Sequence, residues 1–320
     1  MKAFVNKQYG SPDVLNLEEV EKPTPTDDEI RVKIHAVSGN PYDWHFMRGE
    51  PFLARFEAGL FKPKRTILGV DFAGTVETVG KDVTGVQPGD EVFGASAMGA
   101  FAQYVCVPVK RFTRKPANIT FEEAAAIPIA ALTAIQGLRT GGIESGKKVL
   151  INGASGGVGT YAVQLAKHYG AEVTGVCSSR NVEMVRSIGA DHVVDYTKED
   201  VTRSGQHYDQ ILEAVGNFSI AATKRILTPN GHSVVVGYGG LARMFQILGF
   251  APLASRMGSQ TVGMMGAKIA SEDMALLAEL MEAGSIKSVI DRQYPFEELP
   301  EAIRYLETGR ARGKVVIRVV

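Results

Sequence analysis

Cysteine is scarce in this chain, with only two among 320 residues. Cys106 and Cys177 lie in separate strand-like runs, AQYVCVPV and EVTGVCSS, so a zinc thiolate site would have to recruit other ligands. Histidine is also sparse, and the one close pair, His35 and His45, is ten residues apart, which does not match the i, i+4 spacing of helical metal ligands. The sequence argues against a disulfide framework or a metal clip and predicts buried cysteines and structural histidines.

Excess charge and long apolar runs are missing too. The 35 basic residues balance the 35 acidic ones, so no overall field favours nucleic acid or an anionic membrane as a partner. No segment approaches the roughly 18 uninterrupted apolar residues of a membrane-spanning helix, and the strand-like MKAFV at the start is not preceded by a leader-type pattern. We therefore expect a soluble, cytoplasmic protein of about two domains that acts on a small molecule.

The two parts of the chain have different patterns. Residues 1 to about 115 contain short strands separated by glycine and proline, which is typical of a partly closed β architecture. From about residue 121, helical segments alternate with six apolar strands, which indicates a doubly wound parallel sheet. EELPEAIRYLETGR then predicts a helix and KVVIRVV a last strand that returns to the first domain. The result is an α/β protein with a substrate domain at 1–122 and 288–320 and a nucleotide-binding domain at 123–287.

A glycine-rich loop gives the strongest chemical signal. In KVLINGASGGVGTYAVQLAKHYGAEVTGVC, a strand ends at Asn152, a helix follows, and a second strand ends near Cys177. Glycines in this context let a pyrophosphate approach the backbone, and the helix N-terminus supplies unpaired N–H groups; the alternative is a tight turn without a ligand. Ala154 stands at the first position of the G-x-G-x-x-G pattern and still permits the turn. The expected cofactor-binding segment is Ser155, Gly156, Gly157, Val158 and Gly159.

The end of the second strand of this unit predicts the type of dinucleotide. An NAD site usually has a carboxylate there, which binds the ribose hydroxyls. This chain has Cys177, followed by Ser178, Ser179 and Arg180. Hydroxyl groups and a guanidinium suit a 2′-phosphate, so we predict NADP(H), with Ser178 and Arg180 as ligands. The alternative is that Ser179 caps the next helix and Arg180 is solvated.

With this loop behind an N-terminal β domain, the chain resembles the medium-chain dehydrogenase/reductase superfamily over nearly its whole length. Three stretches carry the resemblance: ILGVDFAGTVETVG with VQPGDEVFG, then AAAIPIAALTAIQGL, then GASGGVG. The chain is most similar to the zinc-free quinone oxidoreductase branch. The resemblance implies a GroES-like catalytic domain, a Rossmann domain for NADP(H), a homodimer, and reduction of quinones or activated carbon–carbon double bonds.

The positions that hold zinc in related alcohol dehydrogenases are changed. Where those proteins have a cysteine and then Gly-His-Glu, this chain has Asn40 and then Gly69-Val70-Asp71. Val70 cannot bind zinc, so no metal is expected. Alcohol oxidation normally uses a Lewis acid to stabilise the alkoxide. Without one, an acceptor that delocalises its own charge, a quinone or an enone, is the better substrate.

The resemblance also implies cofactor contacts outside the glycine loop. Thr133 matches a threonine that faces the nicotinamide, and Tyr196 matches a tyrosine beside the adenosine phosphate. Val215 and Gly237 end strands where ribose and nicotinamide contacts usually fall. Lys314 matches a basic residue near the pyrophosphate, although an ordinary exposed lysine is an equal reading.

The stretch AVSGNPYDWHFMRG, residues 36–49, follows an alternating strand and is predicted to turn or begin a helix between Ser38 and Asp43. By resemblance, Asn40 orients the nicotinamide ribose or carboxamide, and Tyr42 is a candidate proton donor or else a core tyrosine. Asp43 is predicted to anchor the turn through backbone N–H groups. Apolar residues at these spacings are more often core than pocket, and the candidate walls of the acceptor pocket are Trp44, Phe46, Met47, Tyr238 and Met264.

Residues 239–259 are longer and more apolar than a simple link between strands. They could form a lid, a subunit contact or a membrane-surface helix, with the first two favoured. Two alternatives to a quinone or enone reductase stay open. One is a zinc-free dehydrogenase of ketones or alcohols that uses Tyr42 as an acid, and the other is a non-catalytic NADPH-binding redox sensor.

Overall fold

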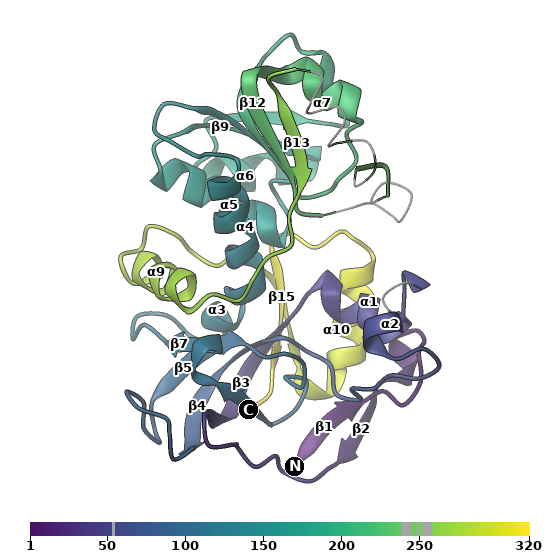
Figure 1. Ribbon diagram of the computed structural model, residues 1–320, viewed down its shortest axis with the longest axis vertical. Coiled ribbons are helices and arrows are strands. Elements are labelled where there is room, and N and C mark those ends of the chain that lie inside the picture. The colour runs from purple at the N-terminus through teal and green to yellow at the C-terminus, as the bar shows by residue number, and fades with distance from the viewer. Residues whose placement is uncertain (53–54, 238–244, 248, 250, 252–257) are drawn as a thin grey trace. The chain divides into compact units, whose positions relative to one another are not determined.

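The computed structural model describes residues 1–52, 55–237, 245–247, 249, 251 and 258–320 (Figure 1). The chain divides into two compact units, which are residues 1–130 with 269–320, and residues 131–268. These units differ from the predicted domains at both boundaries. The helix α9 (Ser271–Glu282), predicted in the nucleotide domain, packs against β7 (Phe112–Arg114), and Asn118 Nδ2 donates to the Glu282 carbonyl at 2.9 Å.

The first unit is built on an antiparallel-rich sheet with strand order β14-β15-β3-β4-β5-β7, and β6 also pairs with β3. In β3, Ile30, Val32 and Ile34 are fully buried and alternate with more exposed residues, as the sequence pattern predicts. A separate hairpin joins β1 and β2. The strand bounds are β1 (Lys2–Val5), β2 (Asn16–Glu19), β3 (Glu29–Gly39), β4 (Asp71–Val79), β5 (Glu91–Ala95), β6 (Tyr104–Pro108), β14 (Ile290–Pro295) and β15 (Lys314–Arg318).

The last strand returns to the first unit, as predicted. β15 pairs antiparallel with β3, with Val316 opposite Ser38, and the yellow β15 lies beside the purple β3 in Figure 1. This pairing places Lys314 next to the end of β3, from which α1 departs. The helices of this unit are α1 (Pro41–Arg48), α2 (Arg55–Ala58), α3 (Phe121–Ala125), α9 and α10 (Leu299–Glu307).

The second unit contains the predicted parallel sheet, with strand order β10-β9-β8-β11-β12-β13. The order reverses between β8 and β11, which is the point where ligands bind in open sheets of this kind. The strands are β8 (Lys148–Asn152), β9 (Glu172–Cys177), β10 (His192–Asp195), β11 (Tyr208–Glu213), β12 (Leu227–Val235) and β13 (Thr261–Met264). The helices are α5 (Gly157–His168), α6 (Val182–Ser187) and α7 (Ile220–Ile226), and α4 (Pro128–Thr140) leads in from the first unit.

The cysteines and the close histidine pair have structural surroundings. Both thiols are free, Cys177 buried and Cys106 half-buried, and burial raises the pKa of each to about 11. The His35 ring stacks on Phe121 with centroids 4.2 Å apart, and its Nε2 lies 3.1 Å from Thr75 Oγ1. His45 Nδ1 lies 2.8 Å from the Glu50 carbonyl oxygen. These contacts agree with the structural role predicted for the two histidines.

Candidate functional site

The glycine-rich loop connects β8 to α5 at the carboxyl edge of the parallel sheet. Gly153 has φ +85°, a left-handed conformation that suits glycine, and its carbonyl accepts from Gly156 N at 3.0 Å. Gly156 is the N-cap of α5, and no side chain caps this end. The first N–H groups of α5 are thus left for a ligand, which is the arrangement that binds phosphate groups in dinucleotide sites.

Gly159 explains why the loop needs glycine inside the helix. A Cβ atom at this position would lie 2.0 Å from the Gly153 carbonyl oxygen and 2.8 Å from Ala154 Cα. Only glycine therefore lets α5 begin this close to the loop. Ala154 is itself fully buried, and its N–H donates to the Val176 carbonyl at 3.0 Å. The departure from the G-x-G-x-x-G pattern is accommodated by packing, as the sequence predicts.

A polar cluster surrounds the end of β9. Ser155 Oγ accepts from Asn181 Nδ2 at 2.9 Å, and Ser178 Oγ lies 3.3 Å from the same nitrogen. Asn181 thereby links two of the predicted cofactor residues. Arg180 is exposed beside them, within the short 3-10 turn Ser179–Asn181. Sequence reasoning missed Asn181 because a single asparagine after a serine-rich turn is not distinctive.

Asp195 was also missed, although it lies directly across the sheet from Cys177. Ser179 Oγ donates to Asp195 Oδ2, and Thr197 N and Oγ1 donate to Oδ1 at 3.0 and 2.7 Å. These hydrogen bonds, that of Ser179 first, lower the pKa of Asp195 to about 2. Lys198 Nζ pairs with Asp195 Oδ2 at 3.4 Å. Ser179 therefore binds a carboxylate rather than capping a helix, and the carboxylate is already engaged by groups of this turn.

The remaining predicted cofactor residues of the second unit lie at strand ends or on α4. Tyr196 directly follows β10 and is exposed, and Val215 lies just beyond β11 and is partly open to solvent. A Cβ at Gly237 would lie 2.2 Å from the Ala214 carbonyl oxygen, so the chain after β12 passes close to the chain after β11. Thr133 is a buried residue of α4. The first three thus follow strands at the same edge as the glycine loop.

Two buried polar residues at this edge were not predicted. Asn152 ends β8 and Glu213 ends the neighbouring β11, and Asn152 Nδ2 donates to Glu213 Oε1 and, at 2.7 Å, to Asn217 Oδ1. Phe218 N donates to Glu213 Oε2 at 3.2 Å. A lone glutamate at the end of an apolar strand carries little sequence signal. In the structure it fixes the chain beyond β11 next to the glycine loop.

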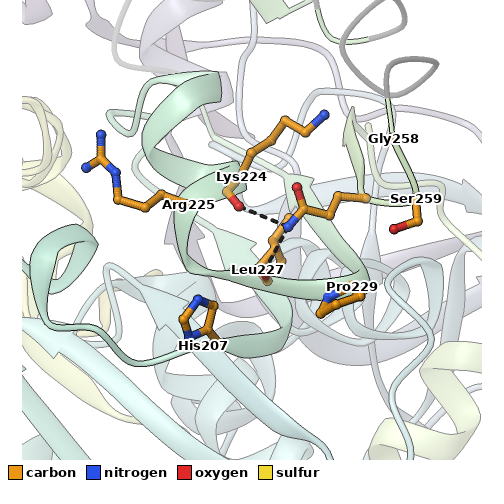
Figure 2. A pocket seen from close by; sticks show the side chains of 8 residues that line it. His207, Lys224, Arg225, Leu227, Pro229, Gly258 and Ser259 are labelled. Atoms are coloured by element: carbon orange, nitrogen blue, oxygen red, sulfur yellow. Dashed lines mark hydrogen bonds between the residues drawn. The ribbon is translucent and has the colours of Figure 1, made fainter.

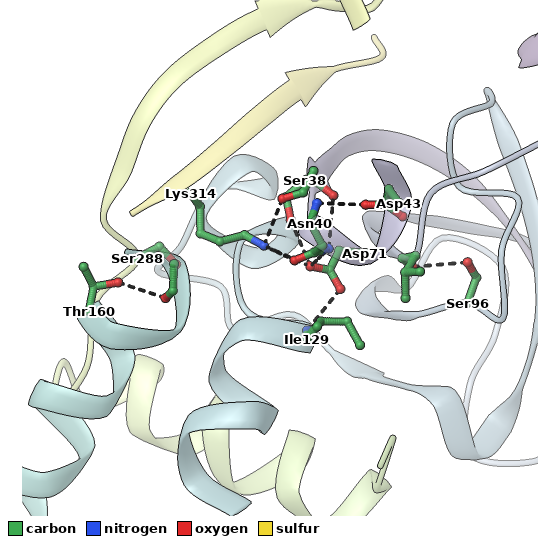
Figure 3. A network of polar contacts seen from close by, with 12 residues as sticks. Ser38, Asn40, Asp43, Asp71, Ser96, Ile129, Thr160, Ser288 and Lys314 are labelled. Atoms are coloured by element: carbon green, nitrogen blue, oxygen red, sulfur yellow. Dashed lines mark hydrogen bonds and ion pairs between the residues drawn. The ribbon is translucent and has the colours of Figure 1, made fainter. Parts of the chain in front are cut away.

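In the first unit, a buried network joins β3, β4 and β15 (Figure 3). Lys314 Nζ donates to Asn40 Oδ1 at 2.6 Å and pairs with Asp71 Oδ2 at 3.3 Å. Asn40 Nδ2 donates to Asp71 Oδ2 at 2.9 Å, and Ser38 Oγ donates to the same oxygen at 2.9 Å. Lys314 is therefore neither an exposed lysine nor isolated from Asn40.

The other end of the network fixes two helix starts. Asp71 Oδ1 accepts from Ile129 N at 3.1 Å, near the start of α4. Asp43 Oδ2 accepts from Asn40 N at 2.8 Å, which confirms its predicted role as an anchor where α1 leaves β3. Burial is the main cause that raises the pKa of Asp43 to about 7, and the nearby Asp71 raises it further. The turn after β3 is thus held by a carboxyl group that titrates near neutral pH.

The predicted acceptor walls on α1 separate into two kinds. Tyr42 is 42% exposed, with its ring centroid 4.4 Å from that of Phe46, so it is not a core tyrosine. Trp44 and Phe46 are half-buried, whereas Met47 is buried in the hydrophobic core of the first unit. Met264 is half-buried at the end of β13. Tyr238, and most of the apolar segment 239–259, lie outside the described residues.

A surface pocket of about 470 Å³ occurs at the opposite edge of the parallel sheet (Figure 2). Its lining includes His207, Lys224 and Gln260, and His207 and Gln260 directly precede β11 and β13. Gln260 Nε2 donates to the carbonyls of Lys224 and Leu227 at 2.9 and 2.8 Å, which closes the end of α7. Because ligands of such sheets bind at the carboxyl ends of the strands, this pocket is not the nucleotide site.

Comparisons with known proteins place the chain in a family. The profile of the alcohol dehydrogenase GroES-like domain matches residues 26–117, and that of the zinc-binding dehydrogenases matches residues 188–317. The chain is 37% identical to a 2-methylene-furan-3-one reductase of Solanum lycopersicum, over 100% of this chain and 79% of the relative. It is 34% identical to a chloroplastic NADPH-dependent alkenal/one oxidoreductase of Arabidopsis thaliana, over 99% and 79%.

Among solved structures, a quinone oxidoreductase from Coxiella burnetii superposes with a TM-score of 0.89 at 30% identity, covering 100% of this chain and 99% of that chain. The chain therefore belongs to the medium-chain dehydrogenase/reductase family, in its quinone oxidoreductase-like branch.

The zinc site that the family name implies does not fit these residues. Val70 has no donor atom, and the side chains of Asn40 and Asp71 are hydrogen-bonded to each other and to the Lys314 ammonium. A divalent cation at this place would meet that positive charge at close range. Among the residues that the structure describes, there is no group of three or more His, Cys, Asp or Glu side chains able to hold a metal ion.

Proposed function

We propose that this protein is an NADPH-dependent oxidoreductase that reduces a quinone or an α,β-unsaturated carbonyl compound without zinc. The names of its relatives, an alkenal/one oxidoreductase and a 2-methylene-furan-3-one reductase, support this reaction class. The observation that carries the proposal is the buried network in which Asn40 and Asp71, at positions of the zinc-site motif, are bound to each other and to Lys314. This supports a reaction without the Lewis acid that alcohol oxidation normally requires, because the side chains of Asn40 and Asp71 are already engaged.

The residues of the second unit support dinucleotide binding. The N–H groups at the start of α5 would hold the pyrophosphate, with Gly159 keeping the helix close to the loop. Ser178 and Arg180 would bind the 2′-phosphate, since a guanidinium suits its oxygens. Bound in this way, NADPH supplies the hydride, and the protein positions the acceptor and excludes water.

A side-chain acid is available for the proton that an enone also requires. Tyr42 is exposed on the first turn of α1, and its ring packs on Phe46. A phenol at this place could protonate the enolate formed by hydride addition. The alternative function, a zinc-free reductase of simple ketones, would need the same residue. Tyr42 alone therefore does not distinguish an enone reductase from a ketone reductase.

A panel of acceptors tests the reaction class. We expect steady NADPH oxidation with quinones and enones, and kcat/KM at least tenfold lower with saturated ketones of the same size. Preference for saturated ketones would favour the dehydrogenase alternative. Tight NADPH binding without turnover of any acceptor would favour a redox sensor.

The edge of the parallel sheet suggests how two copies of the chain could assemble. Among the described strands, β13 is at the edge of the six-stranded sheet, and this edge could pair with β13 of a second copy. We therefore propose a homodimer, and a monomer mass in light scattering would contradict it.

Within the described residues, none of the helices has the length and apolar character needed to cross a bilayer. The cytoplasmic location stays a prediction, since relatives carry chloroplastic and mitochondrial names.

A further inference from the structure

A buried ammonium group of the chain itself binds Asn40 and Asp71, the two residues that stand at positions of the zinc-site motif of metal-containing relatives. Lys314 Nζ has three oxygen neighbours: Asn40 Oδ1 at 2.6 Å, Asp71 Oδ2 at 3.3 Å and the Gly39 carbonyl at 3.4 Å. An ammonium has three N–H donors, so these contacts use its whole capacity. Lys314 and Asn40 are each 3% exposed, and Asp71 is fully buried. A buried lysine with this set of partners is held in one place.

This network also decides which way the Asn40 amide points. An ammonium can only donate hydrogen bonds and a carboxylate can only accept them. Asn40 Oδ1 must therefore face Lys314, and Nδ2 must face Asp71, as Figure 3 shows. The reversed amide would place NH₂ against the ammonium and the oxygen against the carboxylate. Lys314 and Asp71 together exclude that orientation.

The fixed amide has one hydrogen-bonding group that is weakly engaged. One Nδ2 hydrogen serves Asp71; near the other, among the described residues, lie the Ser38 carbonyl at 3.5 Å, the outer limit of a hydrogen bond, and the Asp43 carboxyl group, whose pKa the Asn40 side chain lowers. What Asn40 offers a ligand is thus an N–H donor, and its natural partner is a carbonyl oxygen. Both the nicotinamide carboxamide and the proposed acceptor carry such an oxygen.

We propose that Lys314 replaces the metal as the fixed cation of this site and is a positioning residue that acts through Asn40. With Asp71, it holds the Asn40 N–H toward a carbonyl oxygen of the bound reactants. This inference rests on the proposed function, because the reactants are those of NADPH-dependent reduction. It assigns to Lys314 a role in orientation rather than direct contact with the pyrophosphate.

Removing Lys314 alone would confound orientation with stability, because Asp71 would be left buried without a cation. The informative variant is therefore Lys314→Met combined with Asp71→Asn, which removes both charges and keeps similar volumes. We expect this double variant to have a Tm within a few degrees of wild type. Its kcat/KM should fall about tenfold, since Asn40 is no longer held by an obligate donor and an obligate acceptor. Lys314→Arg, which keeps the donor charge, should retain most of the activity.

Asn40→Ala shows whether the effect passes through Asn40. In an Asn40→Ala background, the double change should cause no further loss of kcat/KM. A matched control is Lys115→Met, because Lys115 is also nearly buried in this unit, with its Nζ 3.0 Å from Glu91 Oε2 and hydrogen-bonded to two carbonyls. That control should lower Tm and leave kcat/KM unchanged.

The NADPH dissociation constant, measured by fluorescence, identifies the source of the carbonyl. Weaker NADPH binding in the double variant indicates the carboxamide, and unchanged binding with lower kcat/KM for the acceptor indicates the acceptor. Three results would overturn the inference. The first is a double variant that is as stable as the wild type and has the same kcat/KM. The second is an additive loss of kcat/KM when the double change is made in the Asn40→Ala background, and the third is stoichiometric zinc in the wild type. If the wild type turns over no acceptor, the proposed function fails, and unchanged NADPH binding in the double variant would then overturn the inference as well.

Discussion

Asp43 is fully buried at the first turn of α1, yet only one of its carboxylate oxygens has a partner. Asn40 N donates to Oδ2 at 2.8 Å, and Oδ1 has no hydrogen-bond partner in the part of the chain that the structure describes. The neighbouring charges are Asp71 and Lys314, so two carboxyl groups share one ammonium. Such a cluster is neutral only when one carboxyl is protonated, which agrees with the pKa of about 7 for Asp43.

This titration predicts a pH dependence of stability. The pKa of Asp43 is higher in the folded protein, about 7, than the roughly 3.9 of an unfolded aspartate, so the folded state binds more protons between these values. Its contribution to the free energy of unfolding therefore falls as pH rises from about 4 to about 7. Asp43→Asn keeps the acceptor for Asn40 N and removes the titration. Urea denaturation at pH 5 and 7.5 should show the variant gaining stability relative to wild type at the higher pH. An identical difference at both pH values would contradict this.

Arg180 is predicted to select the phosphorylated cofactor. Arg180→Ala should raise KM for NADPH about tenfold, since the loss of a charge-assisted hydrogen bond at an exposed place is worth about 1.4 kcal/mol. KM for NADH should change little, because NADH has no 2′-phosphate. Arg186, which pairs with Glu183 on the next helix, provides the control variant Arg186→Ala. Equal effects of Arg180→Ala on both cofactors would remove the assignment.

Tyr42 is the candidate proton donor on α1. If its hydroxyl protonates the enolate, Tyr42→Phe should lower kcat for an enone by about a hundredfold or more, the usual contribution of a general acid. A quinone, whose reduced form can take its protons from water, should be affected less. Comparing kcat for the two acceptor types measures this difference. Unchanged turnover of the enone would exclude the role.

At the scale of elements, the turn from β8 into α5 depends on the close approach of Gly159 to the Gly153 carbonyl oxygen. Gly159→Ala would place a methyl group 2.0 Å from the Gly153 carbonyl oxygen, a contact that the backbone can relieve only by moving. We expect NADPH affinity to fall more than tenfold in titrations monitored by fluorescence, with a lower Tm. Gly263→Ala in β13 is the control, since no atom of the described residues lies within 4 Å of a Cβ there. Wild-type affinity in Gly159→Ala would show that the loop does not bind the pyrophosphate.

Strands of strong apolar character were predictable from the sequence. The six strands of the parallel sheet and the return of β15 to β3 follow from runs such as KVLIN and KVVIR, which have few polar residues. β2 and β14 were missed because NLEE and IDRQYP are mostly polar and exposed, so their strand structure depends on pairing with a neighbour. The unit to which α9 belongs was likewise not predictable, because it depends on contacts with β7 that no local sequence pattern shows.

The candidate site was predictable only in part, for a related reason. The glycine loop has a local signature, because its spacing reports a turn between a strand and a helix. Asp71 and Lys314 are 243 residues apart, and only the pairing of β15 with β3 and of β3 with β4 brings them to Asn40. Glu213 and Asp195 likewise acquire partners through strand register. Local motifs are enough to predict the hydride donor. The Lys314–Asn40–Asp71 network can be found only once the pairing of the strands is known.

At the scale of the whole molecule, the proposed reaction passes hydride from NADPH to an acceptor that needs no metal. The most direct test measures NADPH-dependent reduction of an enone by protein prepared with a chelator, and identifies the product. We predict undiminished kcat/KM and a saturated ketone as the product. Loss of activity in the chelator that is restored by zinc, or an allylic alcohol as the product, would contradict the account.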